Sequence, residues 1–80
     1  MKIKVRYFAS LREKAGISQE EMTIGPGMDL RDLYLDLSKK YDFPLAANEI
    51  KYSVNNEYVE PNIPINESDV IVFIPPVAGG

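Results

Sequence analysis

The sequence predicts an α+β domain in which one curved mixed sheet of about five strands grips one main helix. Alternating apolar and polar segments lie on both sides of a single long amphipathic stretch, which is the order expected for a helix packed on one sheet. The chain has only 80 residues, so it has room for one small core. We therefore expect one domain over residues 1–74 and a C-terminal tail over residues 75–80.

The composition limits the chemistry of this domain. The sequence contains no cysteine and no histidine, so disulfides, thiol nucleophiles and the most common metal ligands are missing from it. The most common general base is missing as well. We expect no metal site and no stand-alone catalysis, and any chemistry on this chain would need a catalyst from another protein.

Charge is distributed unevenly along the chain. Residues 1–14 hold five bases and one acid, whereas residues 15–80 hold four bases and eleven acids. The overall acidity argues against a nucleic-acid partner, and no apolar run is long enough for a membrane helix. The first residues alternate charged and apolar side chains and do not resemble a secretory signal, so we expect a cytoplasmic protein.

The first strand is predicted over residues 2–9. Ile3, Val5 and Tyr7 fall on one face of it, while three bases and Phe8 fall on the other. Phe8 is then either a partner-facing aromatic or a contact with a covering loop.

A short helix is predicted next, over residues 11–15. Ser10 and Glu13 match a capping box, and Gly16 is placed to end the helix. A second strand over residues 20–24 can form a hairpin with the first.

The main helix begins after Asp29, which is a good N-cap residue. Its apolar residues recur at helical spacing and form one stripe, namely Leu30, Leu33, Tyr34, Leu37 and Tyr41. Acidic residues near its start and lysines near its end suit the helix dipole. Pro44 ends this segment.

Three further strands are predicted, over residues 51–54, 58–59 and 70–74. Asn55 and Asn56 lie in the turn between the first two, because asparagine tolerates the left-handed conformation. Pro61 and Pro64 make the following segment irregular or an edge. A turn over residues 66–69 leads into the last strand.

The last strand is apolar on both faces. Ile71 and Phe73 would face the core, whereas Val72 and Ile74 would face the opposite side. Either this strand is buried on both faces, or its second face forms an apolar surface for a partner, together with Phe8 and Tyr58. The second reading requires that the first and last strands pair.

The C-terminal tail follows this strand directly. Pro75 and Pro76 favour an extended exit from the sheet. Gly79 and Gly80 have no side chains, so the terminal carboxylate could enter a narrow channel in another protein. The alternative is a frayed chain end.

Three segments together resemble the MoaD family of sulfur carriers, the small subunits of molybdopterin synthase. They are residues 5–13, Val54-Asn55 and residues 69–80, which end in Pro-Pro-Val-Ala-Gly-Gly. The resemblance implies the ubiquitin-like β-grasp fold with a flexible Gly-Gly tail. The turn over residues 66–69 lacks the glycine often found there in the family.

The resemblance also implies a chemistry for the tail. An E1-like activating enzyme would use ATP to adenylate the carboxylate of Gly80, which would then become a thiocarboxylate. Val77, Ala78 and Gly79 would enter the active site of the large synthase subunit, where sulfur passes to the pterin precursor. The family's synthase is a heterotetramer, and the small subunit binds no permanent cofactor.

Partner-binding residues follow from the resemblance and from the apolar face. Phe8, Tyr58 and Ile74 match family positions at the apolar contact with the large subunit and the activating enzyme, and Arg12 matches an arginine near it. Val72 joins them from its place on the last strand. Arg12 could equally be an ordinary surface charge on its helix.

Two other functions remain open at this point. The chain could carry sulfur for another pathway, such as thiamine, cysteine or tRNA thiolation, because those carriers share the Gly-Gly end. It could also be a ubiquitin-like modifier or adaptor, whose tail becomes amide-linked to a lysine or does not react.

Overall fold

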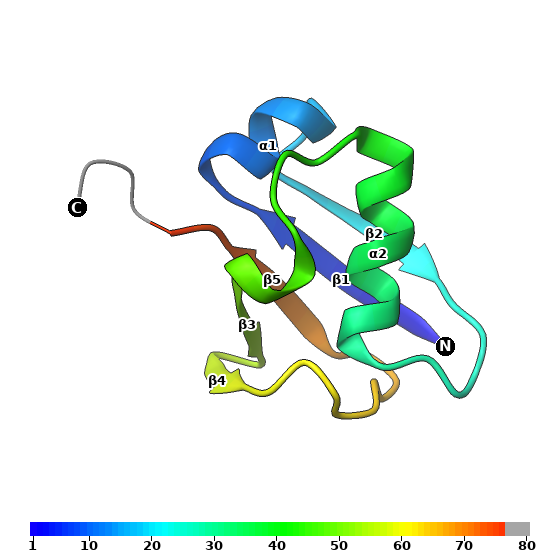
Figure 1. The fold of residues 1–80 in the computed structure, drawn as a ribbon. Helices are drawn as coiled ribbons and strands as arrows, with labels where there is room; N and C mark the ends of the chain where they lie inside the picture. Colours follow the sequence, from blue (N-terminus) through cyan, green and yellow to red (C-terminus); the bar gives the residue numbers. More distant parts are fainter. Residues whose placement is uncertain (77–80) are drawn as a thin grey trace.

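The computed structural model describes residues 1–76, which form one sheet with the main helix across one of its faces (Figure 1). The elements in chain order are β1 (Lys2–Tyr7), α1 (Ala9–Ala15), β2 (Gln19–Thr23), α2 (Leu30–Tyr41), the 3-10 helix η1 (Ala47–Glu49), β3 (Lys51–Val54), β4 (Glu57–Val59) and β5 (Val70–Ile74). This is the β-grasp arrangement that the resemblance implies, and the predicted fold class is confirmed.

The sheet has five strands in the order β2-β1-β5-β3-β4. β1 pairs antiparallel with β2 and parallel with β5, and β3 pairs antiparallel with both β5 and β4. The first and last strands therefore pair, which is the condition for Phe8 to lie beside the last strand. Because β1 and β5 are parallel, they end at the same edge of the sheet.

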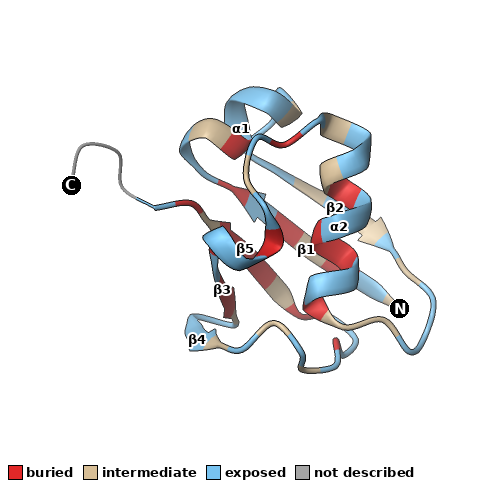
Figure 2. Cartoon of the chain, in the orientation of Figure 1, coloured by how far each residue is buried: buried red, intermediate tan, exposed pale blue. Residues whose placement is uncertain are grey.

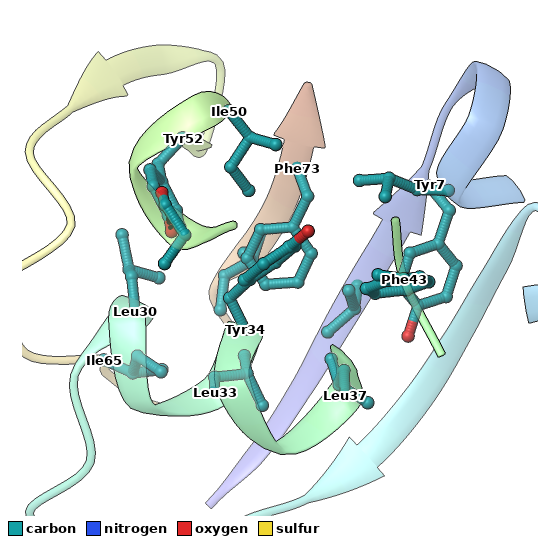
Figure 3. Packing of buried hydrophobic residues seen from close by; sticks show 14 of the residues in the cluster. Tyr7, Leu30, Leu33, Tyr34, Leu37, Phe43, Ile50, Tyr52, Ile65 and Phe73 are labelled. Carbon is teal, nitrogen blue, oxygen red and sulfur yellow. Dashed lines mark hydrogen bonds between the residues drawn. The ribbon is translucent and has the colours of Figure 1, made fainter. Parts of the chain in front are cut away.

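The core lies between the sheet and α2 (Figure 3). Tyr7, Tyr34 and Phe73 are fully buried, from β1, α2 and β5 respectively. The ring of Tyr34 meets that of Phe73 edge-on at 5.1 Å between centroids and stacks on Phe43 at 5.6 Å. Such aromatic pairs add stabilisation beyond the apolar area that they bury.

Helix α2 begins at the predicted N-cap. The side chain of Asp29 accepts a 2.8 Å hydrogen bond from the N–H of Asp32, and the side chain of Asp32 accepts one of 3.3 Å from the N–H of Asp29. This reciprocal capping box was not predicted from the sequence, where the two acids were assigned to helix-end electrostatics. Asp42 ends the helix in the left-handed conformation, with φ 59°.

The predicted capping box of α1 is wrong. The helix begins at Ala9, its N-cap is Phe8, and no side chain caps it. The N–H groups of Leu11 and Arg12 instead donate to the carbonyl oxygen of Phe8, at 3.1 and 3.4 Å. Leu11 is fully buried, and the early turn after β1 brings it to the core. Gly16 ends the helix as predicted, with φ 77°.

Smaller differences concern the strands and turns. β1 ends at Tyr7 rather than Ala9, β2 lies one residue earlier than predicted, and β4 begins already at Glu57. Asn55 and Asn56 both have positive φ, 51° and 72°, as expected for the turn. The short helix η1 was not predicted.

Candidate functional site

One face of the sheet carries no helix, and a row of side chains crosses it. Figure 2 shows α2 on the opposite side of the strands. The register places Arg6 of β1 beside Val72 of β5, Val72 beside Ser53 of β3, and Ser53 beside Tyr58 of β4. Four adjacent strands thus contribute to one continuous surface, which we call the open face.

A shallow groove of about 230 Å³ lies on the open face. Its lining residues are Arg6, Phe8, Ser53, Asn56, Tyr58, Val72 and Ile74. Phe8 is 39% exposed and Tyr58 is 74% exposed, so two aromatic rings of the same groove are accessible to a partner. The groove therefore brings together four of the residues predicted to bind a partner.

Val72 is buried, as in the first of the two readings of the last strand, and not exposed as in the second. It is only 8% exposed, although it lies outside the core cluster. Arg6 and Ser53 flank it in the neighbouring strands, so Val72 forms the floor of the groove. Ile74, at the end of β5, is half-buried.

Arg12 does not line the groove. It lies on α1, exposed to solvent, four residues after Phe8. The structure therefore places Arg12 next to Phe8, whose carbonyl oxygen accepts from its backbone N–H, but outside the groove that the other predicted partner-binding residues line.

Three groove residues were not predicted from the sequence, namely Arg6, Ser53 and Asn56. The guanidinium carbon of Arg6 lies 5.6 Å from the centroid of the Phe8 ring, a cation–π arrangement. The alternation of β1 already places Arg6 and Phe8 on one face, so this pair could have been found from the sequence.

The tail begins beside the groove. Ile74 lines the groove and is followed by Pro75, which is buried, and Pro76, which is exposed. The predicted reactive and inserting residues, Val77, Ala78, Gly79 and Gly80, lie outside the described residues. The open face and the start of the tail thus share the edge at which β1 and β5 end.

A hydrogen-bonded cluster of ionisable side chains lies on the other side of the sheet. Tyr7 and Tyr41 both donate to Oε2 of Glu20, at 2.6 and 2.7 Å. Burial, and secondarily the hydrogen bond to Glu20, raise the pKa of Tyr7 far above its ordinary value. The raised pKa values of Tyr7 and Tyr41 keep both phenols protonated in neutral solution, so the cluster is a structural link between the strands and α2.

Residues 1–76 contain neither a candidate metal site nor a candidate membrane span. No group of three or more His, Cys, Asp or Glu side chains in this part of the chain could hold a metal ion. No helix in it is long and apolar enough to cross a membrane.

The sequence profile of the ThiS family matches residues 5–80, almost the entire chain. The chain belongs to the ThiS family. Two curated relatives are similar over the full length of both proteins. The molybdopterin synthase sulfur carrier subunit of Chlamydomonas reinhardtii is 33% identical, and the alignment covers 100% of both chains. The subunit of the same name from Escherichia coli strain K12 is 31% identical, and the alignment covers 98% of this chain and 99% of the relative.

Several solved structures are similar to this chain in both sequence and fold. A Pyrococcus furiosus protein provisionally named subunit 1 of molybdopterin converting factor is 28% identical, with TM-score 0.77 and 96% and 99% of the two chains covered. A complex of subunits 1 and 2 of that factor from Helicobacter pylori matches with 26% identity, TM-score 0.69 and full coverage of both chains. Small archaeal modifier protein 1 from Methanosarcina acetivorans is 26% identical, with TM-score 0.77 and coverage of 99% and 96%. The fold of this ThiS-family chain is therefore ubiquitin-like.

Proposed function

We propose that this ThiS-family protein is the sulfur carrier subunit of a molybdopterin synthase. The observation that carries the proposal is the full-length similarity to two curated sulfur carrier subunits, in a family match that extends through Gly80. The exposed rings of the open face support a role in which the domain docks on a partner.

The chemistry that we propose takes place at the carboxylate of Gly80. An oxygen of this carboxylate attacks the α-phosphorus of ATP on an E1-like activating enzyme, and pyrophosphate leaves. A sulfide-level donor then attacks the acyl carbon of the adenylate and displaces AMP, which leaves a thiocarboxylate. Free carboxylate resists such substitution because oxide is a poor leaving group, and adenylation removes this barrier.

The thiocarboxylate is the carried sulfur nucleophile. In the proposed reaction, Val77, Ala78 and Gly79 enter the large synthase subunit. The sulfur on Gly80 attacks a carbon of the pterin precursor there and displaces an oxygen leaving group, so that a thioester joins the carrier to the pterin. Water then attacks the acyl carbon of this thioester, which leaves the sulfur on the pterin and releases the carboxylate for another cycle. The two glycines favour this path, since a backbone without Cβ atoms passes through a narrow channel.

The partners follow from this chemistry. We propose a large synthase subunit, with which this chain forms a heterotetramer, and an E1-like activating enzyme, all in the cytoplasm. The solved complex of subunits 1 and 2 of the Helicobacter pylori factor supports the first partner. Phe8, Tyr58 and Ile74, with Val72 as the floor, are the proposed contact, and Arg12 lies to one side of it.

Intact-mass spectrometry tests the proposal directly. The protein is incubated with the activating enzyme, ATP and sulfide, and its mass is expected to rise by the difference between sulfur and oxygen. A variant that lacks Gly80 is the control and should show no gain. The same mass for the full chain before and after incubation would disprove the carrier chemistry.

A second candidate is protein modification, which the similarity to small archaeal modifier protein 1 favours. In that case the tail would form an amide with a lysine of a target protein. Conjugates that survive denaturing electrophoresis and depend on Gly80 would support this function. A carrier for another thiolation pathway would instead gain sulfur but fail to produce molybdopterin with the large subunit.

A further inference from the structure

The charges of the open face are compensated at one end and not at the other. The register places Lys4 opposite Glu21 on β2, so this base has an acidic neighbour. Arg6, in contrast, lies between Gln19 and Val72, which are both uncharged. Opposite charges that face each other across two strands stabilise each other. The neighbouring strands therefore compensate the charge of Lys4 better than that of Arg6.

The position of Arg6 is held by its aromatic neighbour. Its guanidinium lies 5.6 Å from the centre of the Phe8 ring, at the rim of the groove. A planar guanidinium beside a ring loses little freedom when it forms further hydrogen bonds, and its fork of donors matches a carboxylate. Lys51, beside Ile74 in the register, adds a second positive charge at this end of the face.

We propose that Arg6 determines partner specificity by pairing with a carboxylate of the large subunit at the rim of the groove. This inference rests on the proposed function, because it assigns the chemistry of the large subunit's contact surface. The occupant is a segment with an apolar side chain that seats between Phe8 and Tyr58, followed closely by an acidic residue. Charge complementarity argues for it, since the groove is apolar inside and positive at its rim.

The test compares the affinities of four full-length proteins for the purified large subunit. Arg6→Gln removes the charge and Arg6→Lys keeps it without the fork. Lys4→Gln is the matched control, because Lys4 is on the same strand and face but has an acidic neighbour and lies outside the groove. Thermal unfolding of each variant verifies that the fold is intact.

We expect Arg6→Gln to raise Kd about tenfold and Lys4→Gln to raise it by less than about twofold. The Kd of Arg6→Lys should lie between those of the wild type and Arg6→Gln, because lysine keeps the charge but cannot bind a carboxylate with the paired donors of a guanidinium. The effect of Arg6→Gln should shrink between about 0.1 M and about 1 M salt, as the screening length falls from about 10 Å to about 3 Å.

Three results would overturn the proposal. Equal losses for Arg6→Gln and Lys4→Gln would mean that only overall charge matters. A loss for Arg6→Gln that does not change with salt would mean that Arg6 acts by packing on Phe8. In both cases the wild type still binds, so the proposed function stands. Absence of binding by the wild type would instead refute both proposals together.

Discussion

The hydroxyl of Tyr7 donates a 2.6 Å hydrogen bond to Oε2 of Glu20 and thereby joins β1 to β2 beneath the end of α2. Tyr7 is fully buried, so its hydroxyl depends on a partner within the protein. The same carboxylate oxygen accepts from Tyr41, the last residue of α2, at 2.7 Å. One charged side chain on an edge strand therefore satisfies phenols from two other elements.

Glu20→Ala is expected to lower the free energy of unfolding by about 2 kcal/mol, because it leaves the buried phenol of Tyr7 without an acceptor. Urea denaturation followed by circular dichroism measures the change. Glu21→Ala is the control, since Glu21 is exposed on the other face of β2, and it should change stability by less than about 0.5 kcal/mol. Equal effects of the two substitutions would contradict the proposed link.

Stability is expected to fall in alkaline solution. Burial raises the pKa of Tyr34 and of Tyr52 to about 12, from an ordinary value of 10.0. The unfolded chain then releases these phenolic protons first, so the stabilisation is complete below about pH 10 and is lost as the pH rises toward about 12. Urea midpoints across this range measure the loss, and Tyr52→Phe should make it shallower. A midpoint that does not change with pH would argue against the burial of these phenols.

Asn55 and Asn56 provide a matched pair in the β3–β4 turn, because both have positive φ. Only Asn55 uses its side chain for the fold. Its Oδ1 accepts from the N–H of Val70 at 2.9 Å, and its Nδ2 donates to Oδ1 of the buried Asp69 at 3.0 Å. These bonds connect the turn to the start of β5.

Glycine at either position keeps the backbone conformation. Asn55→Gly is therefore expected to cost about 2 kcal/mol through the two lost hydrogen bonds, and Asn56→Gly less than about 0.5 kcal/mol. Thermal unfolding of both variants gives the comparison. A similar cost for both would mean that the turn conformation, and not the side chain of Asn55, determines the stability.

Local patterns in the sequence were sufficient to predict the main elements. The alternation in β1 and the helical spacing of Leu30, Leu33 and Leu37 report directly which side chains face the core. The resemblance added the β-grasp topology. The open face was one of two readings of the sequence, because Phe8 and Ile74 alternate with core residues at the ends of the first and last strands.

The features that were missed depend on contacts between distant segments. Helix α1 begins at Ala9, so Ser10 lies inside it and not at its N-cap, and Leu11 is buried in the core among residues distant in sequence. Glu20 faces the core side of an edge strand, and its two partners are 13 and 21 residues away in sequence. Val72 is covered by neighbouring strands, and no local pattern reports their proximity.

Ser68 lies in the turn before β5, over residues 66–69, which has no glycine. It has φ 67°, a conformation that costs a residue with a Cβ about 1 kcal/mol relative to glycine. Ser68→Gly is therefore expected to raise the melting temperature by roughly 4 °C. Ser38→Gly is the control with the opposite expected sign. It should lower the melting temperature, because Ser38 lies within α2 and glycine destabilises a helix interior. A decrease for Ser68→Gly would show that the serine side chain outweighs the backbone strain.

Phe8→Asp separates partner binding from stability. Phe8 is 39% exposed and is the N-cap of α1, a position that aspartate favours, so the fold should retain its stability. The groove, however, would gain a charge and lose a ring, and the affinity for the large subunit should fall by more than about tenfold. Ile17→Asp is the matched control, because Ile17 is also 39% exposed but does not line the groove. Calorimetric titration measures the affinity, and thermal unfolding measures the stability. Loss of folding in Phe8→Asp would assign Phe8 to the core. Equal binding losses in both variants would show that the groove is not part of the contact surface.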